Sequence, residues 1–185
     1  MYPYQSPKEK ASRILKPNII SNWHILYVKH QHEKRIHEKL MELQLNSFLP
    51  MIQTIRKWSD RKKKIYTPLF SGYIFVEIKK KNELYISTSI PGVFRFLKNG
   101  NQYSKLTNSE YNHLKLLVNA KDIENIQLLT TSPREGENRK ISFGPLKGLE
   151  GQVIKADNKH KIILRIDSMK QNILATVPLH YLMEL

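Results

Sequence analysis

One apolar segment, residues 72–78 ("GYIFVEI"), constrains the fold of this chain more than any other. Its β-branched and aromatic residues predict a strand, in which successive side chains point to opposite faces of a sheet. Tyr73 and Phe75 therefore share one face, and Ile74 and Val76 share the other. Because both faces are apolar, the strand must be covered on both sides, either by layers of the protein itself or by a partner on one side.

The segments around this strand predict a sheet covered by helices. Apolar runs predict four more strands, at residues 23–29, 47–58 and 63–70 and between two turns within residues 91–100. Helical spacing of apolar residues predicts three helices, at residues 33–46, 82–90 and 107–118. The alternation of these elements is typical of an α+β fold in which helices flank an antiparallel sheet.

The chain divides into four predicted segments. Residues 1–22 contain three prolines among polar residues and predict a flexible basic tail before the first domain, residues 23–120. Residues 121–134 have a weak pattern and are expected to form a linker. In residues 135–185, short apolar runs separated by turns predict a small β-barrel.

Positive charge is concentrated in the first domain. The chain carries a net charge of +15, from 31 Lys and Arg residues against 16 Asp and Glu residues. Residues 23–120 hold seventeen bases and seven acids, whereas residues 135–185 hold eight bases and six acids. Such an excess indicates a polyanionic partner such as nucleic acid, although charge that serves solubility alone would give the same total.

The densest positive cluster lies directly before the apolar strand. It has Asp60 as its only acid and consists of Arg56, Lys57, Arg61, Lys62, Lys63 and Lys64. Two interpretations fit a hairpin tip of this composition. It is either a solvated loop or a contact to the phosphate backbone of nucleic acid, where Lys and Arg release counterions without reading the sequence.

Aromatic residues follow the basic cluster. They are Tyr66, Phe70, Tyr73 and Phe75, with Phe94 and Phe96 further along the chain. Core packing is the simplest role for such rings. Rings left exposed would instead favour a protein interface, or stacking on single-stranded bases as a third interpretation. The aromatic signature of an RNA-recognition sheet is absent from this sequence.

No pattern in the sequence predicts an enzyme, a metal site or a bound cofactor. The absence of cysteine excludes disulfides, thiolate ligands and cysteine nucleophiles, and it fits a reducing compartment. His32 and His37 are five residues apart and do not share a helical face, so we expect both, with His30, on a solvated surface. Ser59 and Asp60 lack the nucleophile elbow of a serine hydrolase.

The glycine-rich segment 144–151 ("GPLKGLEG") does not have the order of a phosphate-binding loop. A Walker loop needs Lys directly after its last glycine and then Ser or Thr, but here Lys147 precedes Gly148. We interpret Gly144, Gly148 and Gly151 as residues of a turn that supply positive φ or allow two strands to approach closely.

The sequence gives no sign of a membrane partner. The N-terminal residues lack the apolar core of a secretory signal, and no uncharged apolar run is long enough to cross a bilayer. We therefore expect a cytoplasmic protein, and we expect it to be a monomer.

Several segments together resemble a known family. The segments "NWHILYVKHQHEKRIHEKL", "FLPMIQ", "PLFSGYIFVEI" and "PGVFRFLKNG" resemble the N-terminal (NGN) domain of NusG-type transcription elongation factors. The segment "GPLKGLEGQVIKA" resembles the KOW motif that follows that domain, so the resemblance covers residues 23–185. The insertion "RKWSDRKKK" is most similar to that of specialised UpxY-type antitermination paralogues.

The resemblance implies contacts with RNA polymerase and nucleic acid. It implies an aromatic face that binds the polymerase clamp helices, formed here by Tyr27, Phe70, Tyr73 and Phe75. It implies a contact with the polymerase gate loop around Ser87 and Thr88. It implies contacts with non-template DNA or nascent RNA through Lys29, Arg35 and Lys39. In the family, the KOW barrel recruits a further partner, such as NusE or Rho.

These implications lead to a functional hypothesis with two rivals. We expect an elongation and antitermination factor that suppresses pausing or termination, without chemistry of its own, at particular operons. The rivals are a free-standing KOW-type RNA-binding or ribosome-associated protein and a nucleic-acid-processing enzyme. Ser71 stands where the family usually has Pro, which predicts a looser turn, and Asn138 replaces a usual apolar residue in the first KOW strand, which predicts a weaker barrel edge.

Overall fold

The computed structural model describes most of the two predicted domains. The described residues are 22–57, 62–129, 137–141, 146–148, 150–156, 159–178 and 181. The predictions made for residues 1–21, Arg61 and Gly144 lie outside these ranges. Within the described residues, no helix is long and apolar enough to cross a membrane.

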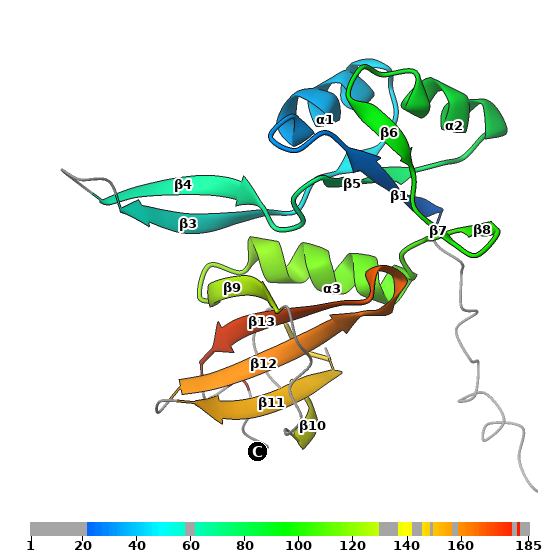
Figure 1. The fold of residues 1–185 in the computed structure, drawn as a ribbon. Coiled ribbons are helices and arrows are strands. Elements are labelled where there is room, and N and C mark those ends of the chain that lie inside the picture. Colours follow the sequence, from blue (N-terminus) through cyan, green and yellow to red (C-terminus); the bar gives the residue numbers. More distant parts are fainter. Residues whose placement is uncertain are drawn as a thin grey trace, which may run out of the picture.

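The first part of the chain forms a four-stranded antiparallel sheet in the order β2-β5-β1-β6. Its strands are β1 (Trp23–Val28), β2 (Ser47–Phe48), β5 (Tyr73–Glu77) and β6 (Val93–Phe96). Three helices accompany it: α1 (Glu33–Glu42), α2 (Lys81–Thr88) and α3 (Asn108–Asn119). Figure 1 shows α1 and α2 on one side of this sheet and α3 on the other. The predicted α+β fold is thereby confirmed.

A two-stranded ribbon projects from this domain (Figure 1). It pairs β3 (Met51–Lys57) with β4 (Lys62–Pro68). The sequence predicted one strand over residues 47–58, but the structure interrupts it between β2 and β3. Pro50 lies at the break, where its missing N–H cannot continue a ladder, and its carbonyl accepts a hydrogen bond from the Leu69 N–H at 2.8 Å.

The second part of the chain forms a five-stranded antiparallel sheet in the order β10-β11-β12-β13-β9. Its strands are β9 (Glu124–Leu129), β10 (Glu137–Lys140), β11 (Glu150–Ala156), β12 (Lys159–Ile166) and β13 (Gln171–Val177). The segment predicted as a linker therefore contains an edge strand. Ile126 and Leu128 of β9 alternate toward the core and pack against it, which the weak pattern of the segment did not reveal.

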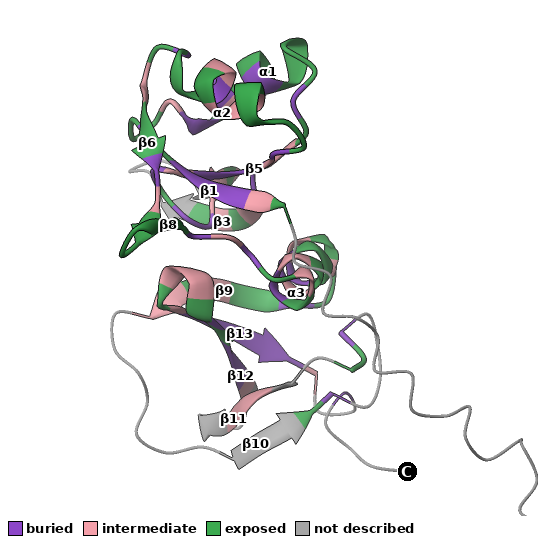
Figure 2. Cartoon of the chain, turned by 90° about the vertical axis from the view of Figure 1, so that its right-hand side faces the viewer, coloured by how far each residue is buried: buried purple, intermediate pink, exposed green. Residues whose placement is uncertain are grey.

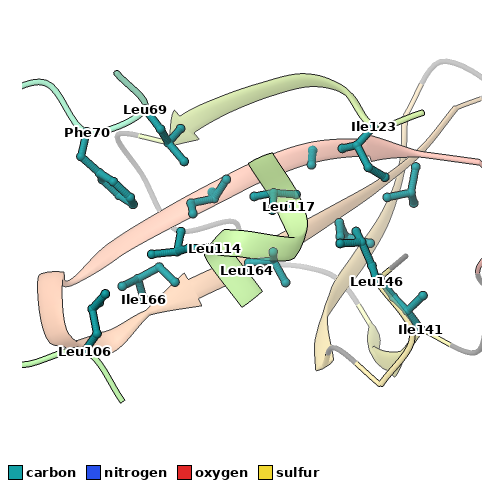
Figure 3. Packing of buried hydrophobic residues seen from close by; sticks show 14 of the residues in the cluster. Leu69, Phe70, Leu106, Leu114, Leu117, Ile123, Ile141, Leu146, Leu164 and Ile166 are labelled. Atoms are coloured by element: carbon teal, nitrogen blue, oxygen red, sulfur yellow. The ribbon is translucent and has the colours of Figure 1, made fainter. Parts of the chain in front are cut away.

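Two hydrophobic clusters hold these layers together. One cluster lies within the first domain, where Ile36 and Leu40 of α1 pack on Leu26 and Ile74 of the sheet. The other joins both parts of the chain, with residues of the first sheet, α3 and the second sheet in one cluster. Figure 3 shows Phe70, Leu106 and Leu114 near Leu164 and Ile166. We call this packing of the two parts the docked arrangement.

Two of the predicted turn glycines have the expected constraints. Gly148 has φ of +87°, which side chains disfavour. Gly151 lies in β11 beside β12, and a Cβ added there would lie 2.8 Å from the Ile163 carbonyl oxygen and 3.0 Å from a Leu164 methyl group. The glycine therefore permits the close approach of two strands, as the sequence predicted.

Candidate functional site

Three aromatic rings form a row across the first sheet. Tyr27 of β1 pairs with Tyr73 of β5, and their ring centroids are 5.4 Å apart. Phe94 of β6 lies on the other side of Tyr27 at 5.2 Å, and the Arg95 guanidinium is 5.9 Å from the Tyr27 ring. The exposed fractions of Tyr27 and Phe94 are 36% and 58%, and Tyr73 is half-buried. We call Tyr27, Tyr73 and Phe94 the open aromatic patch.

The rest of the same sheet face is covered. Trp23 of β1 stacks on Tyr111 of α3, with ring centroids 4.5 Å apart and an interplanar angle of 13°. Phe48 of β2 contacts the same Tyr111 ring edge-on at 5.3 Å, and it stacks on Phe75 at 6.1 Å. One face of the sheet is thus divided into an open aromatic patch and a part closed by α3. Figure 2 shows α3 between the two sheets.

The structure separates the four aromatic residues that the sequence placed on one binding face. Phe75 is fully buried, and Phe70 is 1% exposed with its ring 5.7 Å from that of Phe75. Phe70 belongs to the cluster that includes Leu164 and Ile166 of the second sheet (Figure 3). Neither phenyl ring is therefore accessible in the docked arrangement, in contrast to Tyr27. The expected single face of four residues does not form here.

Phe94 belongs to the open aromatic patch although the sequence gave it no specific role. The sequence FRF at residues 94–96 puts two rings two residues apart, on the same face of a regular strand. The structure buries Phe96 at 4% exposure and leaves Phe94 in solvent. Alternation therefore predicts the same environment for both rings, and the register shift in the pairing of β1 with β6, between Tyr27 and Val28, could not be foreseen from the sequence.

The turn before β5 is fixed by a buried carboxylate. Glu33 of α1 is 3% exposed, and its Oε1 accepts a hydrogen bond from the Gly72 N–H at 2.7 Å. Ser71 Oγ donates to the same oxygen at 3.4 Å and also hydrogen-bonds with His30 Nδ1. Gly72 has φ of +79°. The looser turn expected from Ser71 in place of Pro is not what the structure has, because Glu33 holds it.

A second buried carboxylate joins the two parts of the chain. Glu110 of α3 is 7% exposed and accepts hydrogen bonds from Thr107 N at 2.7 Å and Thr107 Oγ1 at 3.1 Å. Across the boundary it accepts hydrogen bonds from Ser168 N at 3.1 Å and Ser168 Oγ at 2.5 Å. Ser168 lies in a 3-10 turn (Asp167–Met169) between β12 and β13. One carboxylate thus caps α3 and anchors the docked arrangement.

The two residues expected to meet the gate loop differ in accessibility. Ser87 of α2 is fully buried, and its Oγ donates to the Glu83 carbonyl at 2.7 Å. Thr88 is exposed, and its Oγ1 donates to the carbonyls of Leu84 and Tyr85 at 3.1 Å and 3.0 Å. Only Thr88 therefore presents its side chain to solvent at this site.

The basic residues predicted to bind nucleic acid lie on two elements. Lys29 directly follows β1, and Arg35 and Lys39 lie on α1. All three are exposed, and Lys39 forms an ion pair with Glu42 at 2.8 Å. On the ribbon, the backbone register pairs Arg56 with Lys63 and Lys57 with Lys62. Lys63 and Lys64 are exposed. The register therefore places cationic residues on both strands at the end of the described part of the ribbon.

The ribbon is linked to the first helix. Lys34 Nζ of α1 donates a hydrogen bond to the Tyr66 carbonyl at 3.2 Å. Farther along the ribbon, Ile55 and Tyr66 are 65% and 60% exposed, whereas Met51 and Ile52 at its base pack against the hydrophobic clusters. A two-stranded ribbon is marginally stable by itself, and exposed apolar residues on it favour a role in contacting a partner.

Burial favours the neutral form of two histidines of the first domain by lowering their pKa values. Burial lowers the pKa of His37, whose Nδ1 hydrogen-bonds with Ser47 Oγ at 2.7 Å, while nearby Glu38 raises it. Burial is also the main cause of a lowered pKa at His24. His37 was expected on a solvated surface, but it is half-buried between α1 and β2. Within the described ranges, no three His, Asp or Glu side chains gather as metal ligands.

The comparisons with known proteins agree with this fold. The family model for NusG, described as transcription termination factor nusG, matches residues 21–115, which is just over half of the chain. No curated protein sequence matches the chain. A solved structure of Thermotoga maritima NusG, described as showing domain interaction, has a TM-score of 0.51 and 19% identity, over 85% of this chain and 93% of that chain.

A second solved structure is similar at a lower score. The MjSpt4:Spt5 complex in conformation A has a TM-score of 0.31 and 16% identity, over 82% of this chain and 96% of that chain. At 19% identity, the likeness to the Thermotoga maritima structure concerns the fold alone. The family assignment depends instead on the family model, which spans the sheet, α1, α2 and most of α3. The chain therefore belongs to the NusG family.

Proposed function

We propose that this protein is an elongation and antitermination factor that binds RNA polymerase through the open aromatic patch. The observation that carries the proposal is the exposed row of Tyr27, Tyr73 and Phe94, flanked by Arg95. Exposed aromatic residues next to an arginine are typical of the centres of protein interfaces. Binding of this kind favours the elongating state of the polymerase over the paused state without any chemistry by the factor.

The clamp helices are the part of polymerase that we assign to this patch. Tyr27 and Phe94 are accessible in the docked arrangement, whereas Phe70 is not. A contact that also includes Phe70 requires the second sheet to move away from it. Thr88 is the accessible residue for a contact with the gate loop. The second sheet is our candidate for the KOW domain, and we assign NusE or Rho as its partner.

The test is binding to RNA polymerase combined with a pausing assay. The Tyr27→Ala and Phe94→Ala variants should each weaken polymerase binding about tenfold or more, because truncated aromatic anchors cost on the order of 2 kcal/mol. Met41→Ala on α1, where Met41 is 53% exposed, is the matched control and should bind normally. Normal binding and normal pausing in both aromatic variants would contradict the proposal.

For the ribbon we propose a separate contact with nucleic acid. Lys63 and Lys64 are exposed near a tip that also carries Arg56, Lys57 and Lys62 in its register. Each phosphate contact that is lost should reduce the salt dependence of binding. A Lys63→Gln/Lys64→Gln variant should therefore bind single-stranded DNA or RNA more weakly and with a flatter salt dependence, while its affinity for polymerase without nucleic acid stays unchanged. An equal loss of affinity for nucleic acid and for polymerase would contradict the proposal that the ribbon makes a separate contact.

Specialisation for particular operons is the last part of the proposal. It is supported by the long basic ribbon, which resembles the insertion of UpxY-type paralogues. Transcription of templates with and without the leader that precedes the protein's own operon tests it. An equal effect on all templates would indicate a general elongation factor. The rival RNA-binding or ribosome-associated protein would bind RNA but not polymerase.

A further inference from the structure

A cleft lies at the boundary between the two parts of the chain. It has a volume of about 380 Å³. Its first wall is the hairpin of β7 (Lys98–Asn99) and β8 (Gln102–Tyr103), and its second wall is the 3-10 turn between β12 and β13 with Lys170. Figures 1 and 2 both show this hairpin next to the turn that connects β12 to β13. Because the two walls come from different parts, the cleft exists only in the docked arrangement.

Three lysines line the cleft, from both of its walls. Lys98 and Lys105 belong to the first part of the chain and Lys170 belongs to the second. Within the described residues, none of the three has a carboxylate within 4 Å, and Lys98 Nζ lies 5.2 Å from the centroid of the Tyr103 ring. The one acid of the lining, Asp167, forms an ion pair with Arg165 at 2.5 Å. The cleft is therefore cationic.

One lysine of the cleft, Lys105, has an effect on a neighbouring group. His24 is 5% exposed and its pKa is lowered mainly by burial, against a backbone hydrogen bond to Asn22 that raises it, and the charge of Lys105 lowers it as well. Like charges on facing walls repel, so Lys98 and Lys105 on one wall and Lys170 on the other oppose docking of the two parts. An anion between the walls would remove this repulsion.

We propose that the cleft binds the phosphate groups of a small phosphorylated molecule of nucleotide size. Lysine ammonium groups are suitable partners for phosphate, and the volume lies within the range of small-molecule sites. Tyr103, which is 41% exposed, offers a ring for stacking, and the amides of Asn99 and Gln102 offer hydrogen bonds to the rest of the ligand. The inference does not depend on polymerase binding.

A ligand in this position would be linked to docking. It contacts both walls only when the two parts are together, so it stabilises the docked arrangement by its binding free energy. The Glu110 carboxylate holds the second wall in place through Ser168 N and Oγ. Weakening that anchor should therefore weaken ligand binding. Because Ser168 Oγ donates to Glu110, this hydroxyl acts on the ligand only through the position of the second wall.

The experiment is a calorimetric titration of the full chain with inorganic pyrophosphate, with ATP and with a single-stranded RNA 12-mer. Lys105→Gln/Lys170→Gln should weaken pyrophosphate and ATP binding about tenfold or more, because charge-assisted contacts are lost. The matched control is Lys121→Gln/Lys147→Gln, which removes the same charge from two exposed lysines outside the cleft and should bind normally. Ser168→Ala should weaken binding to a smaller extent.

Three outcomes would overturn the proposal. The first is pyrophosphate binding that is equally weakened in both double variants, which would mean a response to net charge alone. The second is binding of the RNA 12-mer at the cleft without binding of pyrophosphate or ATP, which would make the lysines part of a nucleic-acid surface. The third is no detectable heat or thermal stabilisation with either small phosphate compound. Tighter binding of ATP than of pyrophosphate, lost in Tyr103→Ala, would support a ligand that includes a base.

Discussion

The two faces of the first sheet are completed in different ways. On the helix-covered face, Leu26, Val28, Ile74 and Val76 are each at most 1% exposed, and their cover comes from helices of the same domain. On the aromatic face, Trp23 and Phe75 are covered by α3 and the second sheet, while Tyr27 and Phe94 are open. The helix-covered face is fully covered within the first domain, and the aromatic face depends on the second sheet for part of its cover.

This difference explains how one sheet can serve both stability and binding. The helix-covered face is buried by elements that are close in sequence, so it is covered whenever the domain folds. Part of the aromatic face packs inside the protein and part of it is open surface. Phe70 lies in the packed part. A partner that binds the open aromatic patch meets a surface whose neighbouring residues are already occupied by the protein itself.

The largest expected effect separates the two faces by stability. Leu40→Ala on α1 removes a fully buried side chain from the aliphatic cluster and should cost about 2–5 kcal/mol of unfolding free energy. Phe94→Ala on the open aromatic patch should cost only about 0.5 kcal/mol, because most of its side chain is in solvent. Urea denaturation of both variants measures the difference.

Polymerase binding should show the opposite order for the same two variants. Phe94→Ala should lose affinity, whereas Leu40→Ala, measured at a temperature where it remains folded, should keep it. Equal losses of stability in the two variants would mean that the aromatic face is as much a core as the helix-covered face. The comparison of the faces would then be wrong.

Much of the fold could be predicted from the sequence because it depends on local patterns. The apolar character of residues 72–78 on both faces predicted a covered strand, and helical spacing predicted α1 and α3. Strand β9 was missed because its apolar residues are few and gain their burial from β13, which is distant in sequence. Short segments of this kind become strands through tertiary pairing rather than propensity.

The candidate site was less predictable for the same reason. Strand alternation placed Tyr73 and Phe75 on one face, but it could not reveal that α3 would cover only the end near Phe75. The roles of Glu33 and Glu110 were also invisible, since their hydrogen-bond partners Gly72 and Ser168 are far along the chain. Residues whose function depends on long-range contacts carry no local signal.

A smaller effect is expected at the anchor between the two parts. Ser168→Ala removes one of the hydrogen bonds that Glu110 accepts across the boundary and leaves the cap of α3 intact. The loss should weaken docking by about 1 kcal/mol, or about fivefold. If Phe70 takes part in polymerase binding only after undocking, the affinity for polymerase should rise by a similar factor, which a fluorescence titration measures.

The matched control for this variant lies on the same helix. Ser109→Ala removes an exposed hydroxyl whose Oγ hydrogen-bonds with His113 Nε2 at 3.2 Å and does not reach the second sheet. It should leave polymerase affinity unchanged. A Ser168→Ala variant with unchanged or reduced affinity would show that docking does not limit access to Phe70, and the open aromatic patch alone would then account for binding.

The smallest expected effect concerns pH and again distinguishes the faces. His24 and His37 both adjoin the helix-covered face, through contacts with Phe96 and Ser47, and burial lowers both pKa values below 6.5. The unfolded chain therefore binds more protons than the folded chain below about pH 6.5, so stability is complete above this pH and falls as the pH drops toward the folded-state pKa values. A His24→Asn/His37→Asn variant should lose this dependence, giving a flatter profile of unfolding free energy between about pH 7 and pH 5 in urea titrations. If unfolding free energy falls with the same slope in the variant and in the unmodified protein, the two histidines do not cause the acid sensitivity. If it falls more steeply in the unmodified protein alone, the acid sensitivity of the domain comes from the histidines beside the helix-covered face.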